Sequence, residues 1–181
     1  MAERGILKRT AIEFGVGFYA GPGLMHGRLV IPIHNAAGEL IAYCGRSVDG
    51  TQPRYRVPPT FPKSEVLFSL HRAAAGAANS VVVVEGFFDC MKVHQAGIRS
   101  VAALMGSALY GPQCQVLVER FRHVILLLDG DSTGRKASAV IAHTLRPHCS
   151  VQVILLADGL QPDPMSAKDV VDALQWFAND D

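Results

Sequence analysis

The chain has 181 residues, of which 49% are hydrophobic, and it carries a net charge of +1. This length gives one or two small domains with a real core, and a mean hydropathy of +0.22 excludes a disordered chain. No apolar stretch approaches the ~20 residues that cross a bilayer, and the first residues hold no apolar signal core. The four cysteines are far apart and follow no zinc-binding spacing, which argues for reduced thiols. We therefore expect a cytoplasmic protein with no zinc and no membrane partner.

The first part of the chain predicts a small α+β subdomain that is basic. In chain order the pattern indicates a helix over 9–14, strands over 28–34, 40–45 and 55–57, and a helix over 71–78. The glycine-rich stretch 15–25 indicates a loop, and the turn at 35–38 has the chemistry of a hairpin. Four prolines between 47 and 65 predict an extended loop around the third strand. Residues 1–72 hold nine Lys and Arg against five Asp and Glu, so this part presents positive charge.

The rest of the chain alternates strands with helices. The expected strands cover 81–84, 101–104, 124–128 and 151–156, and the expected helices cover 87–96, 112–120, 133–145 and 167–177. This alternation predicts an α/β fold with a mostly parallel, doubly wound sheet flanked by helices. We therefore predict two domains, a basic α+β one over 1–78 and a sheet domain with a C-terminal helix over 79–181.

Acidic residues directly follow two of the expected strands. The tripeptide 129–131, Asp-Gly-Asp, follows the apolar run 124–128, and the dipeptide 85–86, Glu-Gly, follows 81–84. Because ligands bind at the carboxyl ends of the strands in an open α/β sheet, we expect these acids to lie together at that edge. Such a cluster is costly unless a divalent cation neutralises it. A lone Asp-Gly-Asp is more typical of a solvated turn. The prediction of a metal site therefore depends on the acid that follows the other strand, 81–84.

Small residues beside the acids favour phosphate chemistry. Gly86, Gly130 and Gly134 let phosphates approach the backbone, and Ser132 or Thr133 can cap the following helix, whose N-terminus favours anions. The glutamate of the first strand end either completes the shell of the ion or acts as a general base. The site therefore suits phosphoryl or phosphodiester chemistry, with metal ions at the attacking and leaving oxygens.

Taken together, these motifs resemble the Toprim domain, which DnaG-type primases share with topoisomerases and some nucleases. The Glu-Gly-x-x-Asp of 85–89 and the Asp-Gly-Asp-x-x-Gly of 129–134 are most similar to the DnaG-type primases. Upstream motifs appear in the order found in the primase catalytic core, at 27–33, 45–46, 53–55 and 63–68. The resemblance covers about residues 3–170 and implies a Toprim-type sheet behind a small basic α+β subdomain.

The resemblance also implies roles for individual residues. The acids implied to bind metal and act in catalysis are Glu85, Asp129 and Asp131, with Asp163 as a further metal ligand and Asp89 as a supporting acid. The residues implied to contact nucleic acid or nucleotide are Arg28, Arg46, Arg54, Tyr55, Lys63, Gly86, Gly106 and Gly134. The implied cofactors are one or two Mg²⁺ or Mn²⁺ ions.

The chain departs from the family pattern at Gln161, which stands where the family's Asp-Pro-Asp motif has its first acid. We expect this exchange to weaken one metal position. The zinc-binding domain that precedes the family's core and the helicase-binding domain that follows it have no counterpart here. Contact with a replicative helicase would therefore need those missing domains.

The leading hypothesis is a nucleotidyltransferase of the DNA primase type, which joins nucleoside triphosphates into short RNA primers on a single-stranded DNA template. One alternative is a Toprim nuclease. Another is a non-catalytic or accessory nucleic-acid-binding protein of a mobile element, which Gln161 and the missing zinc domain motivate.

Overall fold

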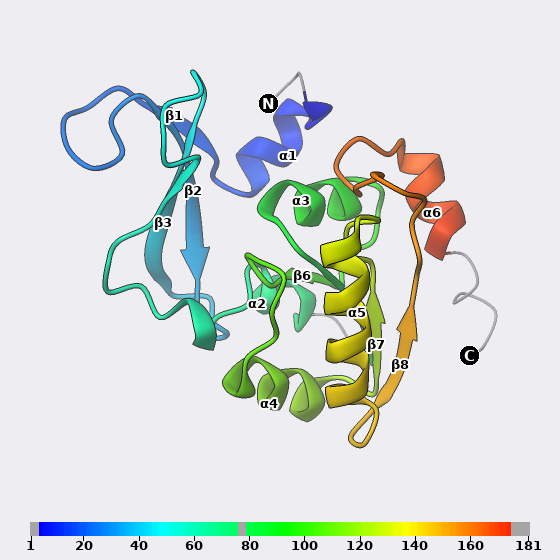
Figure 1. Cartoon of the computed structure of the whole chain (residues 1–181). Helices are drawn as coiled ribbons and strands as arrows, with labels where there is room; N and C mark the ends of the chain where they lie inside the picture. The colour runs from blue at the N-terminus through cyan, green and yellow to red at the C-terminus, as the bar shows by residue number, and fades with distance from the viewer. Residues whose placement is uncertain (1–3, 76–78, 175–181) are drawn as a thin grey trace.

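The computed structural model describes residues 4–75 and 79–174, which form two four-stranded sheets with helices around them (Figure 1). The strands are β1 (Gly17–Tyr19), β2 (Arg28–His34), β3 (Leu40–Ser47), β4 (Tyr55–Arg56), β5 (Ser80–Val84), β6 (Val101–Ala103), β7 (His123–Leu126) and β8 (Ser150–Val153). The helices are α1 (Lys8–Glu13), α2 (Leu70–Ala73), α3 (Phe87–Gln95), α4 (Gly111–Arg120), α5 (Ser132–Leu145) and α6 (Ala167–Leu174), with the short 3-10 helix η2 (Lys63–Glu65). The predicted α/β fold class is confirmed.

The first sheet is antiparallel and has the order β1-β2-β3-β4. The predicted hairpin joins β2 to β3, with Ile31 opposite Cys44 and both side chains buried. The side chain of Asn35 shapes the turn, because its Oδ1 accepts hydrogen bonds of 3.0 Å from the backbone nitrogens of Ala37 and Glu39. Gly38 follows at a φ of 85°, a conformation that glycine adopts without strain.

Two parts of this sheet region differ from the sequence prediction. Strand β1 lies within the stretch predicted to be a loop, and it pairs antiparallel with β2. Its three residues are all exposed, so the strand has no alternation of buried and exposed side chains that a sequence pattern could reveal. Within the predicted extended loop, η2 forms a single helical turn. The predicted helices over 71–78 and 167–177 overlap α2 and α6, and their residues 76–78 and 175–177 lie outside the described part.

The second sheet is entirely parallel and has the order β6-β5-β7-β8. Both of its faces are covered, so alternate residues of one strand enter two different cores. Val82 and Val84 pack with α3 and α6, whereas Val81 and Val83 pack with α4 and α5. This two-sided burial explains why the central strands are continuous apolar runs in the sequence.

The strand order places a topological switch point at β5. The chain passes from β5 to β6 on one side and then returns to pair β7 with the other side of β5. Helix α3, which follows β5, and helix α5, which follows β7, cover opposite faces of the sheet. The carboxyl ends of β5 and β7 therefore open into the crevice where ligands bind in folds of this kind.

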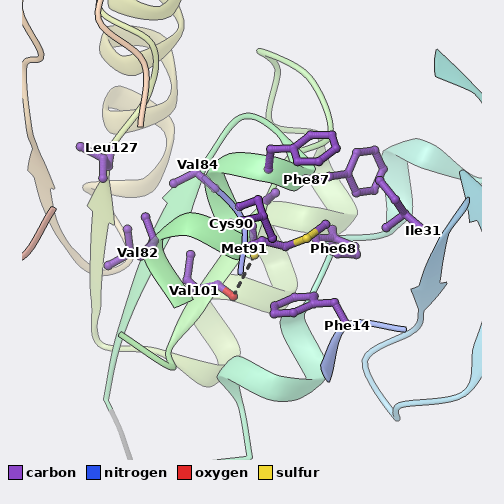
Figure 2. Close-up of a cluster of buried hydrophobic side chains, with 14 of the residues drawn as sticks. Phe14, Ile31, Phe68, Val82, Val84, Phe87, Cys90, Met91, Val101 and Leu127 are labelled. Atoms are coloured by element: carbon purple, nitrogen blue, oxygen red, sulfur yellow. Dashed lines mark hydrogen bonds between the residues drawn. The ribbon is translucent and has the colours of Figure 1, made fainter. Parts of the chain in front are cut away.

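A shared apolar core joins the two sheets. Figure 2 shows Phe14 and Ile31 from the antiparallel side together with Phe68, Phe87 and Met91 against the parallel sheet. The rings of Phe68 and Phe87 meet edge to face with centroids 4.8 Å apart, and those of Phe14 and Phe68 are 5.8 Å apart. Such aromatic pairs stabilise a contact beyond the area they bury. This core holds the two sheets at a fixed relative position. The division at residue 78 stays a prediction.

Within the described residues, no helix combines the length and the apolar character that a membrane span requires.

Candidate active site

A cleft of about 460 Å³ lies between the two sheets, over the carboxyl ends of the parallel strands. We call the four acids that line this cleft its floor: Glu85, Asp89, Asp129 and Asp163. Its wall consists of Arg54, Tyr55 and Lys63 from the region of β4 and η2. Gly86 and Gly106, two of the glycines that the sequence singled out, also line this cleft.

Close backbone packing fixes the turn that carries Asp129. The nitrogen of Gly130 donates to Leu160 O at 2.8 Å, and a Cβ on this glycine would lie 2.1 Å from Ala157 O. A Cβ on Gly134 would lie 2.1 Å from Asp129 O. The structure thus shows a packing role for these two glycines, and the approach of phosphates to them stays a prediction. They let the acidic turn pack against the start of α5 and the loop after β8.

The two main acids of the floor touch each other through the backbone. Glu85 Oε1 accepts a hydrogen bond of 3.2 Å from the nitrogen of Asp129. Burial, followed by the charge of Asp129, raises the pKa of Glu85 to about 7. Burial and then the charge of Asp131 raise the pKa of Asp129 as well. Both shifts show that negative charge is unfavourable at this point without a compensating cation.

Asp131 lies outside the lining of the cleft and is exposed. Its Oδ1 accepts a hydrogen bond of 2.8 Å from the nitrogen of Gly134, so Asp131 is the N-cap of α5. The predicted cap at Ser132 or Thr133 was wrong by one or two residues. Asp131 still raises the pKa of Glu85 and Asp129 through its charge.

Asp89 connects two loops of the floor. Its Oδ2 accepts from Gly86 N and its Oδ1 accepts from Asp163 N, both at 3.0 Å. Burial raises the pKa of Asp89 to about 6, with further contributions from the charges of Asp129 and Asp163. Because a backbone donor binds each oxygen, the geometry fits the supporting position predicted for this acid.

Gln161, which the sequence singled out only as a departure from the acidic motif, and Arg4, which it did not single out, contact the acids of the floor. Gln161 Nε2 donates to Asp129 Oδ2 at 2.6 Å, so the residue that interrupts the acidic motif contacts an acid directly. Arg4 forms an ion pair with Asp163, and its guanidinium also lies 5.0 Å from the centre of the Phe88 ring. No sequence pattern predicts the contact of Arg4, which joins positions 159 residues apart.

The wall combines cations with aromatic rings. Arg46, a predicted contact residue, lies outside the lining of the cleft and supports the wall: it donates to Tyr55 Oη at 2.6 Å, and its guanidinium lies 4.9 Å from the Tyr55 ring centre. Arg54 lies 6.0 Å from the same ring, on a side chain that is exposed. Lys63 Nζ lies 3.0 Å from the position that a Cβ on Gly106 would take. Side chains of this kind can receive phosphates and stack with bases.

Arg28 does not belong to this wall. Its side chain is buried, with 3% of the residue exposed, and its guanidinium donates to Pro53 O at 2.8 Å. The predicted contact with nucleic acid is therefore corrected to a structural role, in which Arg28 ties β2 to the loop before β4. By the pleat, Arg28 lies on the face of β2 opposite the buried Ile31 and Ile33, and its side chain is buried there beside Gly45, whose Cβ position lies 2.9 Å from Arg28 Cδ.

The floor fits a divalent cation in part. Asp129 Oδ1 is buried and has no hydrogen-bond partner among the described residues, which is costly unless another group satisfies it. Over 4–75 and 79–174, no three His, Cys, Asp or Glu side chains already converge on one point. Mg²⁺ commonly takes only one or two carboxylates and fills its shell with water and substrate phosphate. Glu85 and Asp129 therefore suffice as protein ligands for such an ion.

Comparison with known proteins identifies the family. The Toprim domain family matches residues 79–155, and the family "DNA primase catalytic core, N-terminal domain" matches residues 23–74. A DNA primase of Staphylococcus aureus is 30% identical over 185 residues, covering 99% of this chain and 30% of that protein. The chain is a homologue of the DnaG primase catalytic core. The predicted resemblance is confirmed, and the chain spans about 30% of the length of this relative.

Solved primase structures share the fold. The Aquifex aeolicus primase, with zinc-binding and RNA polymerase domains, matches with a TM-score of 0.85 and 26% identity, over 97% of this chain and 54% of that chain. The RNA polymerase domain of Mycobacterium tuberculosis primase DnaG was solved in complex with a double-stranded DNA oligomer with a 6-nucleotide overhang. It matches with a TM-score of 0.80 and 26% identity, over 99% of this chain and 71% of that chain.

Proposed function

We propose that this chain is the catalytic part of a metal-dependent nucleotidyltransferase of the DNA primase type, which makes short RNA primers on a single-stranded DNA template. The observation that carries the proposal is the cleft itself, whose acidic floor faces a basic and aromatic wall. The homology with DnaG primase cores gives this combination its reaction class. The bound DNA in the Mycobacterium tuberculosis relative supports nucleic acid as the partner.

The floor would position the metal and the reacting oxygens. Glu85 and Asp129 would hold one Mg²⁺ or Mn²⁺ ion, which stabilises charge on the phosphates and lowers the pKa of a 3′-hydroxyl. Asp89 keeps the loops at the ends of β5 and β8 in register through its two backbone hydrogen bonds. Asp131 stays at the cap of α5, and its charge adds to the attraction for a cation.

The wall would bind the polyanionic partners. Arg54 and Lys63 supply the positive charge that a triphosphate or a DNA backbone requires, and Arg46 adds charge from beside Tyr55. The Tyr55 ring offers a face on which a base can stack.

All four cysteines of the chain are free thiols, which is consistent with the reducing cytoplasm in which we expect the protein to act.

A template-directed synthesis assay tests this function. The purified chain would be incubated with single-stranded DNA, labelled ribonucleotides and Mg²⁺ or Mn²⁺, with EDTA as the metal-free control. We expect short RNA products that need both the template and the metal. Folded protein that binds the DNA but forms no product with either metal would contradict the proposal and favour the accessory role. Metal-dependent cleavage of the DNA would favour the nuclease.

A further inference from the structure

The acids of the floor fall into two groups with different partners. Among the described residues, Asp129 Oδ1 is buried without a partner, and the carboxylate of Glu85 accepts one long hydrogen bond, from Asp129 N. These oxygens form the inner half of the floor. Asp129 Oδ2 and the carboxylate of Asp163 form the outer half, and both receive donors from other side chains.

Gln161 occupies the outer face of Asp129. Its amide nitrogen donates to Oδ2 at 2.6 Å, a short contact for an amide and a carboxylate. An amide nitrogen cannot ligate a cation, because it has donors and no free lone pair. As long as this bond holds, Oδ2 faces a donor and not a metal ion.

Arg4 forms an ion pair with the carboxylate of Asp163 and so makes it less available to a cation. The pair is largely shielded, with 13% of the Asp163 side chain and 30% of the Arg4 side chain exposed. The guanidinium is also held over the Phe88 ring, which fixes its direction. A cation that approached Asp163 would have to displace a permanent positive charge, since arginine does not lose its proton in proteins.

We propose that Gln161, as a hydrogen-bond donor, and Arg4, as a counter-charge, occupy the outer half of the floor, so that the nucleotide-free protein binds one divalent cation, at Glu85 and Asp129 Oδ1. This inference rests on the proposed metal-dependent function and specifies how many ions the protein itself recruits. The amide at Gln161 therefore has a role of its own in the site. An acid at this position would be a metal ligand, whereas the amide donates a hydrogen bond that orients Asp129. Any further ion has to come with the phosphates of the substrate.

Counting bound Mn²⁺ on the full chain tests this proposal. Electron paramagnetic resonance of free Mn²⁺, without nucleotide or DNA, gives the number of ions bound per chain. We expect one ion for the wild type and two for Gln161→Glu, which keeps the shape of the side chain and replaces the donor with a carboxylate. Gln152→Glu makes the same chemical change on exposed β8, outside the lining of the cleft, and should leave the count at one.

A thermal unfolding series accompanies the count. Gln161→Glu places two carboxylates together, so its melting temperature in EDTA should fall below that of the wild type and rise more on addition of Mn²⁺. Arg4→Gln frees Asp163 by a different route and should also raise the Mn²⁺ count to two. This second variant decides the matter if Gln161→Glu does not fold.

The possible results separate the two proposals. A wild type that binds two ions overturns the single-ion inference and leaves metal-dependent catalysis standing. Folded Gln161→Glu and Arg4→Gln variants that both still bind one ion also overturn it. A wild type that binds no Mn²⁺ contradicts the metal-dependent function itself.

Discussion

The floor and the wall of the cleft acquire their shape in different ways. Backbone groups hold the floor, because nitrogens of the neighbouring turns donate to Glu85 and to both oxygens of Asp89. The wall is built from long side chains, and Tyr55 is held by a side-chain contact, because Arg46 donates to its hydroxyl and lies over its ring. Geometry imposed by a central sheet is rigid, whereas stacked cations and rings can adapt to a strand of variable sequence. We infer that the floor determines the chemistry and the wall determines affinity.

Replacing Asp129 should have the largest effect of any change in the cleft. Asp129→Asn keeps the size of the side chain and removes the charge that the proposed cation requires. Loss of one preorganised electrostatic contact costs about 10²–10³ in kcat, so primer synthesis should fall at least that far. DNA affinity should change little, because the wall is intact. Gel-based primer synthesis and fluorescence anisotropy with labelled single-stranded DNA measure the two quantities.

A suitable control for that experiment is Asp172→Asn on α6, where the carboxylate pairs with Lys168 outside the lining of the cleft. Its activity should equal that of the wild type. If Asp129→Asn loses DNA binding and activity in parallel, the assignment of chemistry to the floor and affinity to the wall is wrong.

Removing the aromatic ring of the wall should have a smaller effect, which falls on DNA affinity and not on the rate of synthesis. Tyr55→Ala removes a ring that is 37% exposed and flanked by Arg46 and Arg54. A stacked base contributes about 1–3 kcal/mol, so the Kd for single-stranded DNA should rise roughly tenfold. The kcat at saturating template should stay within about twofold of the wild type. Anisotropy titrations and synthesis at saturating DNA measure these values.

Tyr19→Ala serves as the matched control, because Tyr19 is also exposed, at 43%, and lies on β1 outside the lining of the cleft. Its Kd should be unchanged. Equal losses in both variants would mean that the wall has no special part in DNA binding.

The floor was largely predictable from the sequence, and the reason is physical. Apolar runs buried on both faces mark central parallel strands, and an acid at the end of such a run can only emerge at the sheet edge. Glu85 and Asp129 satisfy that condition and line the cleft together. Asp131 shares the motif but caps α5, because it stands directly before Ser132, the first residue of that helix. A pattern of residue types does not distinguish these two outcomes.

The contacts of the outer floor and the wall were less predictable. Arg4 contacts Asp163 across 159 positions of the sequence, and no local pattern encodes such a contact. The basic residues 28, 46, 54 and 63 are equivalent by composition, yet only 54 and 63 line the cleft. Arg28 is buried on the other face of β2 from the core, where the backbone carbonyls of Gly45 and Pro53 accept from its guanidinium. Arg28 and Arg46 lie on strands, where the sheet register sets the direction of the side chain, whereas Arg54 and Lys63 lie in a loop and a 3-10 helix, and residue type alone does not distinguish these settings.

The pH dependence of stability should give the smallest effect and tests the floor without any substrate. In the unfolded chain the pKa values are ordinary, 4.5 for Glu85 and 3.8 for Asp89, and in the folded protein they rise to about 7 and about 6. Between about pH 4 and pH 7 the folded state therefore holds more protons than the unfolded state, so the free energy of unfolding falls as the pH rises. The expected loss in EDTA is on the order of 1–2 kcal/mol, allowing for solvent screening.

Comparison with Glu85→Gln isolates this effect from other titrating groups, some of which act in the opposite direction, such as Glu13 with its lowered pKa. Urea unfolding in EDTA should show that Glu85→Gln gains stability over the wild type at pH 8 and little or none at pH 5. Glu119→Gln, on the exposed surface of α4, should show no such difference. Addition of Mg²⁺ at pH 8 should raise the stability of the wild type more than that of Glu85→Gln, because binding to the folded state stabilises it by mass action. A wild type whose advantage over Glu85→Gln grows with pH in EDTA would mean that Glu85 is stabilised in its charged form by the protein alone, and the floor would then have no need of a cation.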